Sequence, residues 1–256
     1  MTEAVSQDLY GAELVLHGRI RTASNATFLG SIGEVAVVYK PIAGERPLWD
    51  FPDGTLAGRE VAAYLLSEAT GWNIVPRTWL GDGPHGPGML QEWQAVAEDE
   101  AVSLVQGDDV PDGWLPVVEG YDERDRPVTL IHEDSDALRR MAVFDVVVNN
   151  ADRKGGHVLP MDDGHRYGVD HGVTFHHEHK LRTVLWGWGG LSLTAEETAV
   201  LEVLLQQCRG ELAVALEPHL APHELDALER RIRRLLADGA LPVPGDHWPS
   251  IPWPPF

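Results

Sequence analysis

The stretch FDVVVNNADRKGGHVLPMDDGHRYGVDHG, residues 144–172, contains the most informative pattern in the chain. An apolar run that is typical of a buried helix leads directly into the pair Asp152 and Arg153. Two short strand-like pieces follow around a turn at 162–164, and Asp170 comes 18 residues after Asp152. Loops that leave such elements often carry catalytic side chains, so this stretch predicts two carboxylates in one site.

The chain before this stretch has the pattern of a small sheet with one helix. Short segments rich in β-branched residues and broken by glycine predict strands at 13–23, 25–30, 34–41, 72–80 and 88–94. Apolar residues at helical spacing predict a helix over 57–71 that stops at Gly71, after a loop with three prolines.

The remainder of the chain is mainly helical in pattern. Residues 96–137 are acidic, show no clear periodicity and are expected to form loops. ALRRMAVFDVVVNN predicts a buried helix, and two strongly helical segments begin near Thr194 and Pro222. The sequence therefore predicts a single α+β domain over 1–256. We expect a small mixed N-terminal lobe, a larger, mainly helical C-terminal lobe and a Pro-rich tail, at about 11–95, 96–240 and 241–256.

The composition narrows the possible partners. Lys and Arg number 20 against 40 Asp and Glu, which gives a formal net charge of −20 and disfavours nucleic acid and anionic membranes. The lone Cys208 excludes an internal disulfide framework. The acidic N-terminus lacks the pattern of a signal peptide, so we expect a cytoplasmic protein without stable membrane binding.

The order of four side chains indicates phosphoryl transfer. This chemistry needs cations on the phosphates, a carboxylate near the acceptor hydroxyl and oxygen ligands for a metal ion. Lys40 ends a predicted strand, Glu60 lies 20 residues later in the first helix, and Asp152 and Asp170 follow. Each residue alone is common, but all four in the order found in kinases favour a functional site.

Five segments carry a resemblance to a known family: VVYKP, REVAAYLL, NIVPRT, FDVVVNNADRKGGHVL and GVDHG. Over roughly residues 20–175 the chain resembles the phosphatidylinositol 3-/4-kinase superfamily. It is most similar to the type II phosphatidylinositol 4-kinases and their small bacterial relatives of unassigned function. The resemblance implies a bilobal protein-kinase-like fold, ATP as a substrate, and Mg²⁺ or Mn²⁺ as the metal.

The resemblance also implies a role for individual side chains. Asp152 corresponds to the catalytic Asp, with Arg153 beside it as a structural or phosphate-facing cation, and Asp170 corresponds to a metal ligand. The expected nucleotide contacts come from the covering loop, from the Lys and its acidic partner, and from the hinge between the lobes. They are Ser24, Asn25 and Thr27, Lys40 and Glu60, and Gln91, Glu92 and Trp93.

Two features depart from the family pattern. The covering loop SNATF has no glycine, which would let backbone amides approach phosphates closely, although its hydroxyl and amide side chains offer other donors. His157 stands five residues after Asp152, where the family has an Asn that binds the second metal ion. Imidazole is a poorer ligand than oxygen for Mg²⁺ and suits Mn²⁺ or Zn²⁺ better.

Three functions remain open from the sequence. The first is an ATP-dependent phosphotransferase that acts on a hydroxyl of a small molecule, head group or protein. The second is a nucleotide-binding module without efficient catalysis. The third is a metal-dependent hydrolase that uses the clustered His157, His165, His171, His176, His177 and His179. A solvated loop is the simpler explanation of the cluster. In the kinase interpretation these histidines, with Lys180 and Arg182, would instead contact the acceptor.

Overall fold

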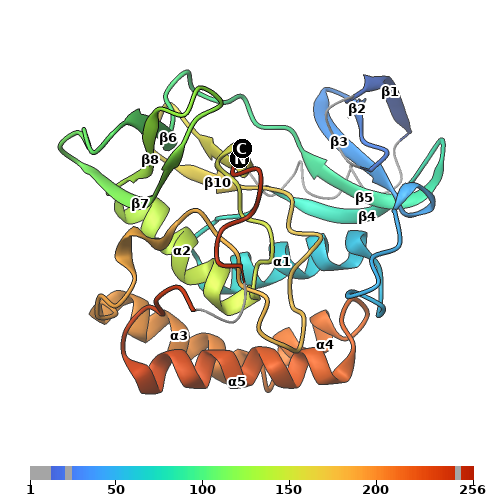
Figure 1. Cartoon of the computed structure of the whole chain (residues 1–256). Coiled ribbons are helices and arrows are strands. Elements are labelled where there is room, and N and C mark those ends of the chain that lie inside the picture. The colour runs from blue at the N-terminus through green and yellow to red at the C-terminus, as the bar shows by residue number, and fades with distance from the viewer. Residues whose placement is uncertain (1–12, 21–24, 246–248) are drawn as a thin grey trace.

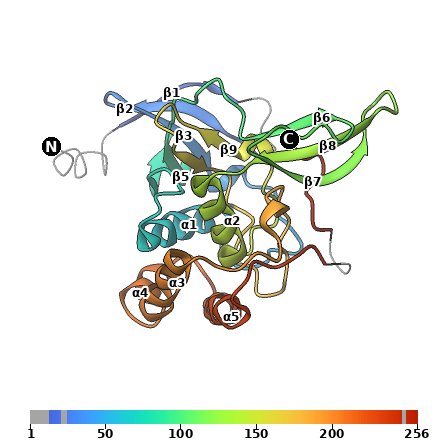
Figure 2. The same cartoon turned by 90° about the vertical axis from the view of Figure 1, so that its left-hand side faces the viewer.

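Most strands lie in the first half of the chain and most helices in the second half, as Figure 1 shows. The structure is a computed structural model and describes residues 13–20, 25–245 and 249–256. The two larger sheets lie at one end of the molecule, and helices α3, α4 and α5 form the opposite end (Figure 2). The predicted fold class is therefore confirmed as an α+β chain, sheet-rich in its N-terminal part and helical in its C-terminal part.

The first sheet is antiparallel and has five strands. In spatial order they are β1 (Leu14–Arg19), β2 (Phe28–Ile32), β3 (Val35–Pro41), β5 (Gly86–Glu92) and β4 (Thr78–Gly83). A short 3₁₀ helix, η1 (Ile42–Gly44), follows β3. The strand predicted to begin at residue 72 begins only at Thr78. Pro76 has no amide hydrogen for a ladder, and the Ser67 hydroxyl accepts hydrogen bonds from the amides of Ile74 and Val75.

Helix α1 (Leu56–Thr70) connects this sheet to the helical part of the chain. It begins after Thr55, whose side chain accepts from the Gly58 amide, and it ends at Gly71 with a positive φ of 68°. Arg59 on its buried side forms an ion pair of 2.7 Å with Glu224 of α5 (Pro222–Asp238). The helix is thereby held between the sheet and α5.

The expectation of loops over 96–137 is wrong, because this region forms a second antiparallel sheet. Its strands are β6 (Val102–Gln106), β8 (Pro127–Glu133) and β7 (Trp114–Tyr121), in that spatial order. The pattern is hard to see for two reasons. Pro116 lies at a register shift in the edge strand β7, and the turns between the strands are acidic.

The C-terminal part contains four helices and a small hairpin. The predicted buried helix is α2 (Asp136–Val148), which begins at the Ser135 cap and ends at Asn149 with φ of 54°. The hairpin and the other elements are η2 (Gly155–His157), β9 (Val158–Pro160), β10 (Arg166–Gly168), η3 (Trp186–Trp188), α3 (Ala195–Gln207) and α4 (Glu211–Leu216). The two C-terminal helices predicted from sequence, α3 and α5, are confirmed, whereas the six-residue α4 was not predicted. Among the described residues, no helix is both long enough and apolar enough to cross a membrane.

A buried histidine connects the second sheet to η3. His132 of β8 is fully buried, and its Nε2 accepts a hydrogen bond of 3.0 Å from the Gly187 amide. The Nδ1 atom therefore carries the hydrogen and donates it to the Glu133 carbonyl at 2.8 Å, while the ring packs in a tilted arrangement on Trp188, with centroids 4.3 Å apart. Burial lowers the pKa of His132 below its usual value, because a charged imidazolium is poorly solvated there.

This arrangement predicts acid destabilisation. The unfolded chain takes up a proton on His132 at a pH near 6.5, whereas the folded chain resists it, so the free energy of unfolding should fall as the pH drops below about 6.5. His132→Gln, which keeps an acceptor for Gly187, should reduce this slope by up to about 1.4 kcal/mol per pH unit. Urea unfolding between pH 7.5 and 5 measures this slope, with His17→Gln at an exposed histidine as control. Equal slopes in all three proteins would contradict the prediction.

Candidate active site

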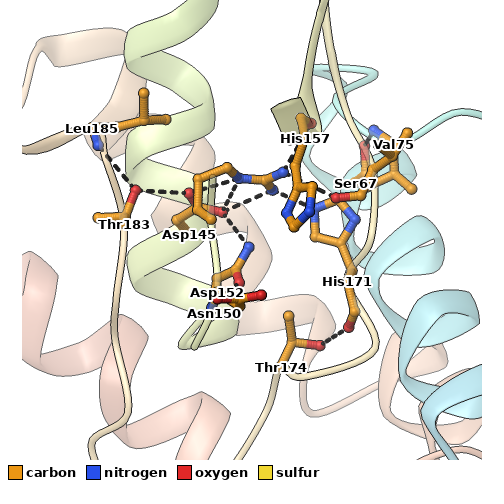
Figure 3. Close-up of polar contacts among 12 residues, drawn as sticks. Ser67, Val75, Asp145, Asn150, Asp152, His157, His171, Thr174, Thr183 and Leu185 are labelled. Carbon is orange, nitrogen blue, oxygen red and sulfur yellow. Dashed lines mark hydrogen bonds and ion pairs between the residues drawn. The ribbon is translucent and has the colours of Figure 1, made fainter. Parts of the chain in front are cut away.

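The chain segment after α2 is organised around a buried ion pair. Arg153 and Asp145 are both fully buried, and the guanidinium donates from Nε and Nη2 to the carboxylate at about 3.0 Å. Asp145 also accepts from the Asn150 amide at 3.0 Å and from the Thr183 hydroxyl at 3.3 Å (Figure 3). The carboxylate therefore holds α2, the loop after it and the segment around residue 183 together.

The same guanidinium fixes the two segments that carry the predicted metal ligands. Its Nη1 donates to the carbonyls of His157 at 3.2 Å and Val169 at 3.1 Å, and its Nη2 lies 2.6 Å from His171 Nε2. All these partners are internal, and Arg153 lines neither of the two cavities described below. This placement corresponds to the structural role considered for Arg153 and does not fit a phosphate-facing or catalytic one.

Lys40 lies between two carboxylates from different parts of the fold. Its Nζ is 2.7 Å from Glu60 Oε1 on α1 and 2.7 Å from Asp170 Oδ1 in the loop after β10. The second oxygen of Glu60 accepts from the His171 amide at 2.9 Å, so α1 and this loop are bound directly to each other. The structure thus brings together three of the four residues whose order suggested phosphoryl transfer.

Electrostatics keep this group charged. Burial alone would lower the pKa of Lys40, but the carboxylates of Asp170 and Glu60 raise it well above its usual value. The Lys40 ammonium in turn holds the pKa of Asp170 well below its usual value. Burial raises the pKa of Glu60, and Lys40 opposes that shift. At neutral pH the site therefore contains an ammonium and an ionised Asp170.

His157 and Asp170 face each other at the other end of this group. Nε2 of His157 lies 3.4 Å from Asp170 Oδ2, and Asp170 has a positive φ of 62°, uncommon for a residue other than glycine. Two neighbouring ligands of an octahedral ion lie about 3 Å apart when each is about 2.1 Å from it. These two atoms therefore fit one edge of a divalent metal site, in which nucleotide phosphates and water would supply the other ligands.

Asp152 lies apart from the Lys40 group, at the end of α2. Its amide donates to the Asn150 side chain at 3.0 Å, and its carboxylate is 3.5 Å from Lys154 Nζ. Burial raises the pKa of Asp152, although the positive charges of Lys154 and Arg182 oppose the shift. A carboxylate with a raised pKa, one-third exposed and within reach of a ligand, is suited to accept a proton.

The first cavity has a volume of about 350 Å³ and is lined by residues of both lobes. It contains the predicted hinge and covering-loop residues Asn25, Thr27, Gln91, Glu92 and Trp93, together with Lys40, His157 and Asp170. The amides of Glu92 and Trp93 are already bonded to the carbonyls of Arg77 and Ala36. An adenine would therefore need other groups of the hinge, such as carbonyls or Gln94, which also lines the cavity. The predicted contact Ser24 lies outside the described residues.

The second cavity has a volume of about 440 Å³ and adjoins the first. Both cavities are lined by Asn25, Lys40 and Asp170, but Asp152 lines only the second. Arg182 also lines it, as the sequence suggested for an acceptor-contacting cation. The two cavities therefore meet at the Lys40–Asp170 ion pair, with Asp152 on the side away from the hinge.

The clustered histidines do not form a metal site of three or more ligands. Within the described part of the chain, no group of three His, Cys, Asp or Glu is arranged to hold an ion. Instead, His176 stacks on His177 at 4.5 Å, and His177 contacts His223 edge to face at 4.8 Å. These contacts resemble ordinary packing between the loop and α5.

The sequence did not indicate that the end of the chain reaches this site. The Pro255 carbonyl accepts a hydrogen bond of 2.8 Å from the Gly155 amide, between Asp152 and His157. A Cβ atom on Gly155 would lie 2.6 Å from the Phe256 ring, so only glycine fits without a shift. The Pro-rich tail thus packs against the loop that carries Asp152.

Breaking the buried ion pair tests whether it organises the loop. Asp145→Asn keeps the shape of the side chain but leaves the Arg153 charge buried without a counter-ion, so the free energy of unfolding should fall by about 3 kcal/mol or more. Glu196→Gln is the matched control, because its ion pair with Arg140 is solvent-exposed and should change stability by less than about 1 kcal/mol. Chemical unfolding measures both free energies of unfolding. If Asp145→Asn lost as little stability as Glu196→Gln, the Arg153–Asp145 pair would not be important for the fold.

Comparisons with known proteins bear on the fold and the family of the chain. No family model matches the sequence. Two crystal structures of the Golgi casein kinase, one with Mn/ADP bound, have TM-scores of 0.57 at 14% and 13% identity and cover 92% of this chain and 74% of theirs. They confirm a kinase-like fold, but not the phosphatidylinositol 3-/4-kinase class. Protein Rv2133c of Mycobacterium tuberculosis is 50% identical over 262 residues, which cover 97% of this chain and 94% of that protein. The chain therefore belongs to the same family as protein Rv2133c, and it has a kinase-like fold.

Proposed function

We propose that the chain is an ATP-dependent phosphotransferase that transfers the γ-phosphoryl group of ATP to a hydroxyl acceptor. The observation that carries this proposal is the meeting of two cavities at the Lys40–Asp170 ion pair. Phosphoryl transfer requires a nucleotide and an acceptor to bind on either side of a charged centre. The Golgi casein kinase, which shares the fold, has been crystallised with Mn/ADP, which supports a nucleotide and a divalent metal as ligands.

Each side chain has a role in the proposed reaction. The nucleotide lies in the first cavity, with its phosphates next to Lys40, and the acceptor lies in the second. The acceptor oxygen attacks the γ-phosphorus and forms a new O–P bond, the bond from the γ-phosphorus to the β–γ bridging oxygen breaks, and ADP leaves with that electron pair. Asp152 orients the hydroxyl and takes its proton. Asp170 and His157 would hold a divalent metal, which supplies charge neutralisation when bound.

We further propose that this family is related to the phosphatidylinositol 3-/4-kinase superfamily. The support is the order and spacing of Lys40, Glu60, Asp152 and Asp170, together with the segment NIVPRT at 73–78. The positions of the first three on β3, on α1 and after α2 are consistent with it. The net charge of −20 argues against a membrane lipid as the acceptor.

Replacement of Asp152 separates catalysis from nucleotide binding. Asp152→Asn should lower ATP turnover by about 100-fold or more, because it removes the proton acceptor, while the affinity for ADP with Mn²⁺ stays within about twofold of the wild type. Asp162→Asn, at an exposed position in the β9–β10 turn, is the control and should behave as wild type. Turnover is measured as ADP release with Mg²⁺ or Mn²⁺, and binding by calorimetry.

Two outcomes would change this conclusion. Nucleotide binding without turnover in the wild type, across hydroxyl acceptors and in autophosphorylation, would favour the nucleotide-binding module. No nucleotide binding with either metal would remove the support for a phosphotransferase.

His157 should determine which metal the site prefers. His157→Asn replaces an imidazole nitrogen by an amide oxygen, so the ratio of Mn²⁺- to Mg²⁺-supported ADP affinity should fall relative to the wild type. The neighbouring Lys154→Gln keeps the donor set and should leave this ratio unchanged. Calorimetric ADP titrations with each metal test this. An unchanged ratio in His157→Asn would mean that the imidazole is only part of the scaffold.

A further inference from the structure

The second cavity contains two arginines without a carboxylate partner among the described residues. Most other arginines of the described chain form ion pairs: Arg59, Arg126, Arg139, Arg140, Arg153, Arg166, Arg209, Arg233 and Arg234. Arg46 and Arg182 form none with any described residue, yet both line the cavity that contains Asp152. Arg46 is exposed and Arg182 is partly buried, so their shared cavity, more than the missing ion pairs, distinguishes them from an arginine such as Arg124.

The carboxylates that line this cavity are already bound to other groups. Glu45 accepts from the first amides of α1 at 2.8 and 3.0 Å, and Asp50 lies 3.8 Å from Lys180. Glu60 and Asp170 bind Lys40, and Asp152 lies near Lys154. Neither arginine forms an ion pair with any of these carboxylates, although the Arg182 charge acts to lower the pKa of Asp152.

Arg182 is held rigidly beside the proposed proton acceptor. Its amide donates to the Asn150 carbonyl at 2.8 Å, and its carbonyl accepts from the Arg153 amide at 3.0 Å. Its backbone is thus bonded to both sides of Asp152. The Nε atom of Arg182 is buried and has no hydrogen-bond partner among the described residues. A buried guanidinium N–H without a partner is costly, and among the described residues with such an atom Arg182 is the one that lines the second cavity.

Resting on the proposed function, we infer that the acceptor is a small hydroxyl compound that carries an anionic group, which Arg182 and Arg46 bind. A guanidinium group presents two parallel N–H donors that match phosphate, sulfate or carboxylate oxygens. A volume of about 440 Å³ suits a compound of the size of a sugar phosphate. The anionic group sits at the arginines and directs the reacting hydroxyl towards Asp152.

Matched pairs of compounds test this inference directly. Inorganic phosphate, glycerol 3-phosphate and glucose 6-phosphate are titrated by calorimetry, with glycerol and glucose as the uncharged counterparts. The titrations are run with saturating ADP and Mn²⁺, and again without nucleotide. The anionic compounds should bind and the uncharged ones should not. Arg182→Met should weaken anion binding by about 10-fold or more, since it removes charged hydrogen bonds.

Three further variants make the result specific. Arg46→Met should also weaken anion binding, and Arg182→Lys, which keeps the charge without the fork, should give an intermediate affinity. Arg124→Met is the matched control, because it removes an exposed arginine without an ion pair in the turn between β7 and β8. It should bind as wild type. Thermal unfolding of each variant checks that the fold is intact.

The outcomes separate this inference from the proposed function. Failure of the wild type to bind any of the three anions, or equal anion affinity in wild type and Arg182→Met, overturns the inference. An equal loss of ADP affinity in Arg182→Met also overturns it, because the arginine would then serve the nucleotide. Failure of the wild type to bind ADP contradicts the proposed function instead, and the titrations without nucleotide still report on the arginines.

Discussion

The buried ion pair between Arg153 and Asp145 is the interaction on which the candidate site depends. Burial of two charges is costly unless every donor finds a partner, and here the guanidinium bonds a carboxylate, two backbone carbonyls and an imidazole. The two carbonyls belong to His157 and Val169, one a proposed metal ligand and the other adjacent to Asp170. A hydrophobic replacement could fill the same space, but it could not fix both loops at once. The main role of the ion pair is therefore to fix the positions of these two loops, more than to increase the stability of the fold.

The sequence could identify those parts of the site where residue chemistry and spacing both signal a role. Lys40 at a strand end, Glu60 in the following helix and Asp170 in the segment VDHG were all predicted. The structure places carboxylate oxygens of Glu60 and Asp170 at 2.7 Å from Lys40 Nζ. The roles of these residues stay predictions. The internal position of Arg153 was harder to predict from the sequence, because its partners come from residues 145 to 171 and only tertiary packing reveals them.

Other features had no local signal in the sequence. Strand β7 has a register shift at Pro116, and acidic turns separate β6, β7 and β8, so period-two alternation does not stand out. The contact of Pro255 and Phe256 with Gly155 joins residues about 100 positions apart. A sequence rich in proline indicates an extended tail, but not the surface on which that tail lies. Long-range contacts of this kind depend on the assembled fold.

A histidine at the proposed metal-ligand position is compatible with the electrostatics of this site. Burial is the main factor that lowers the pKa of His157 below its usual value, and the Arg153 charge acts in the same direction, whereas Asp170 opposes them. Coordination requires a neutral imidazole, because a protonated nitrogen has no free electron pair. A lowered pKa means that His157 is already neutral at physiological pH, so a metal ion need not displace a proton. Asp170 is ionised by Lys40 and lies only 3.4 Å from Nε2. The two side chains of the proposed metal site are therefore a usable pair of ligands, in which the imidazole nitrogen is softer than an amide oxygen.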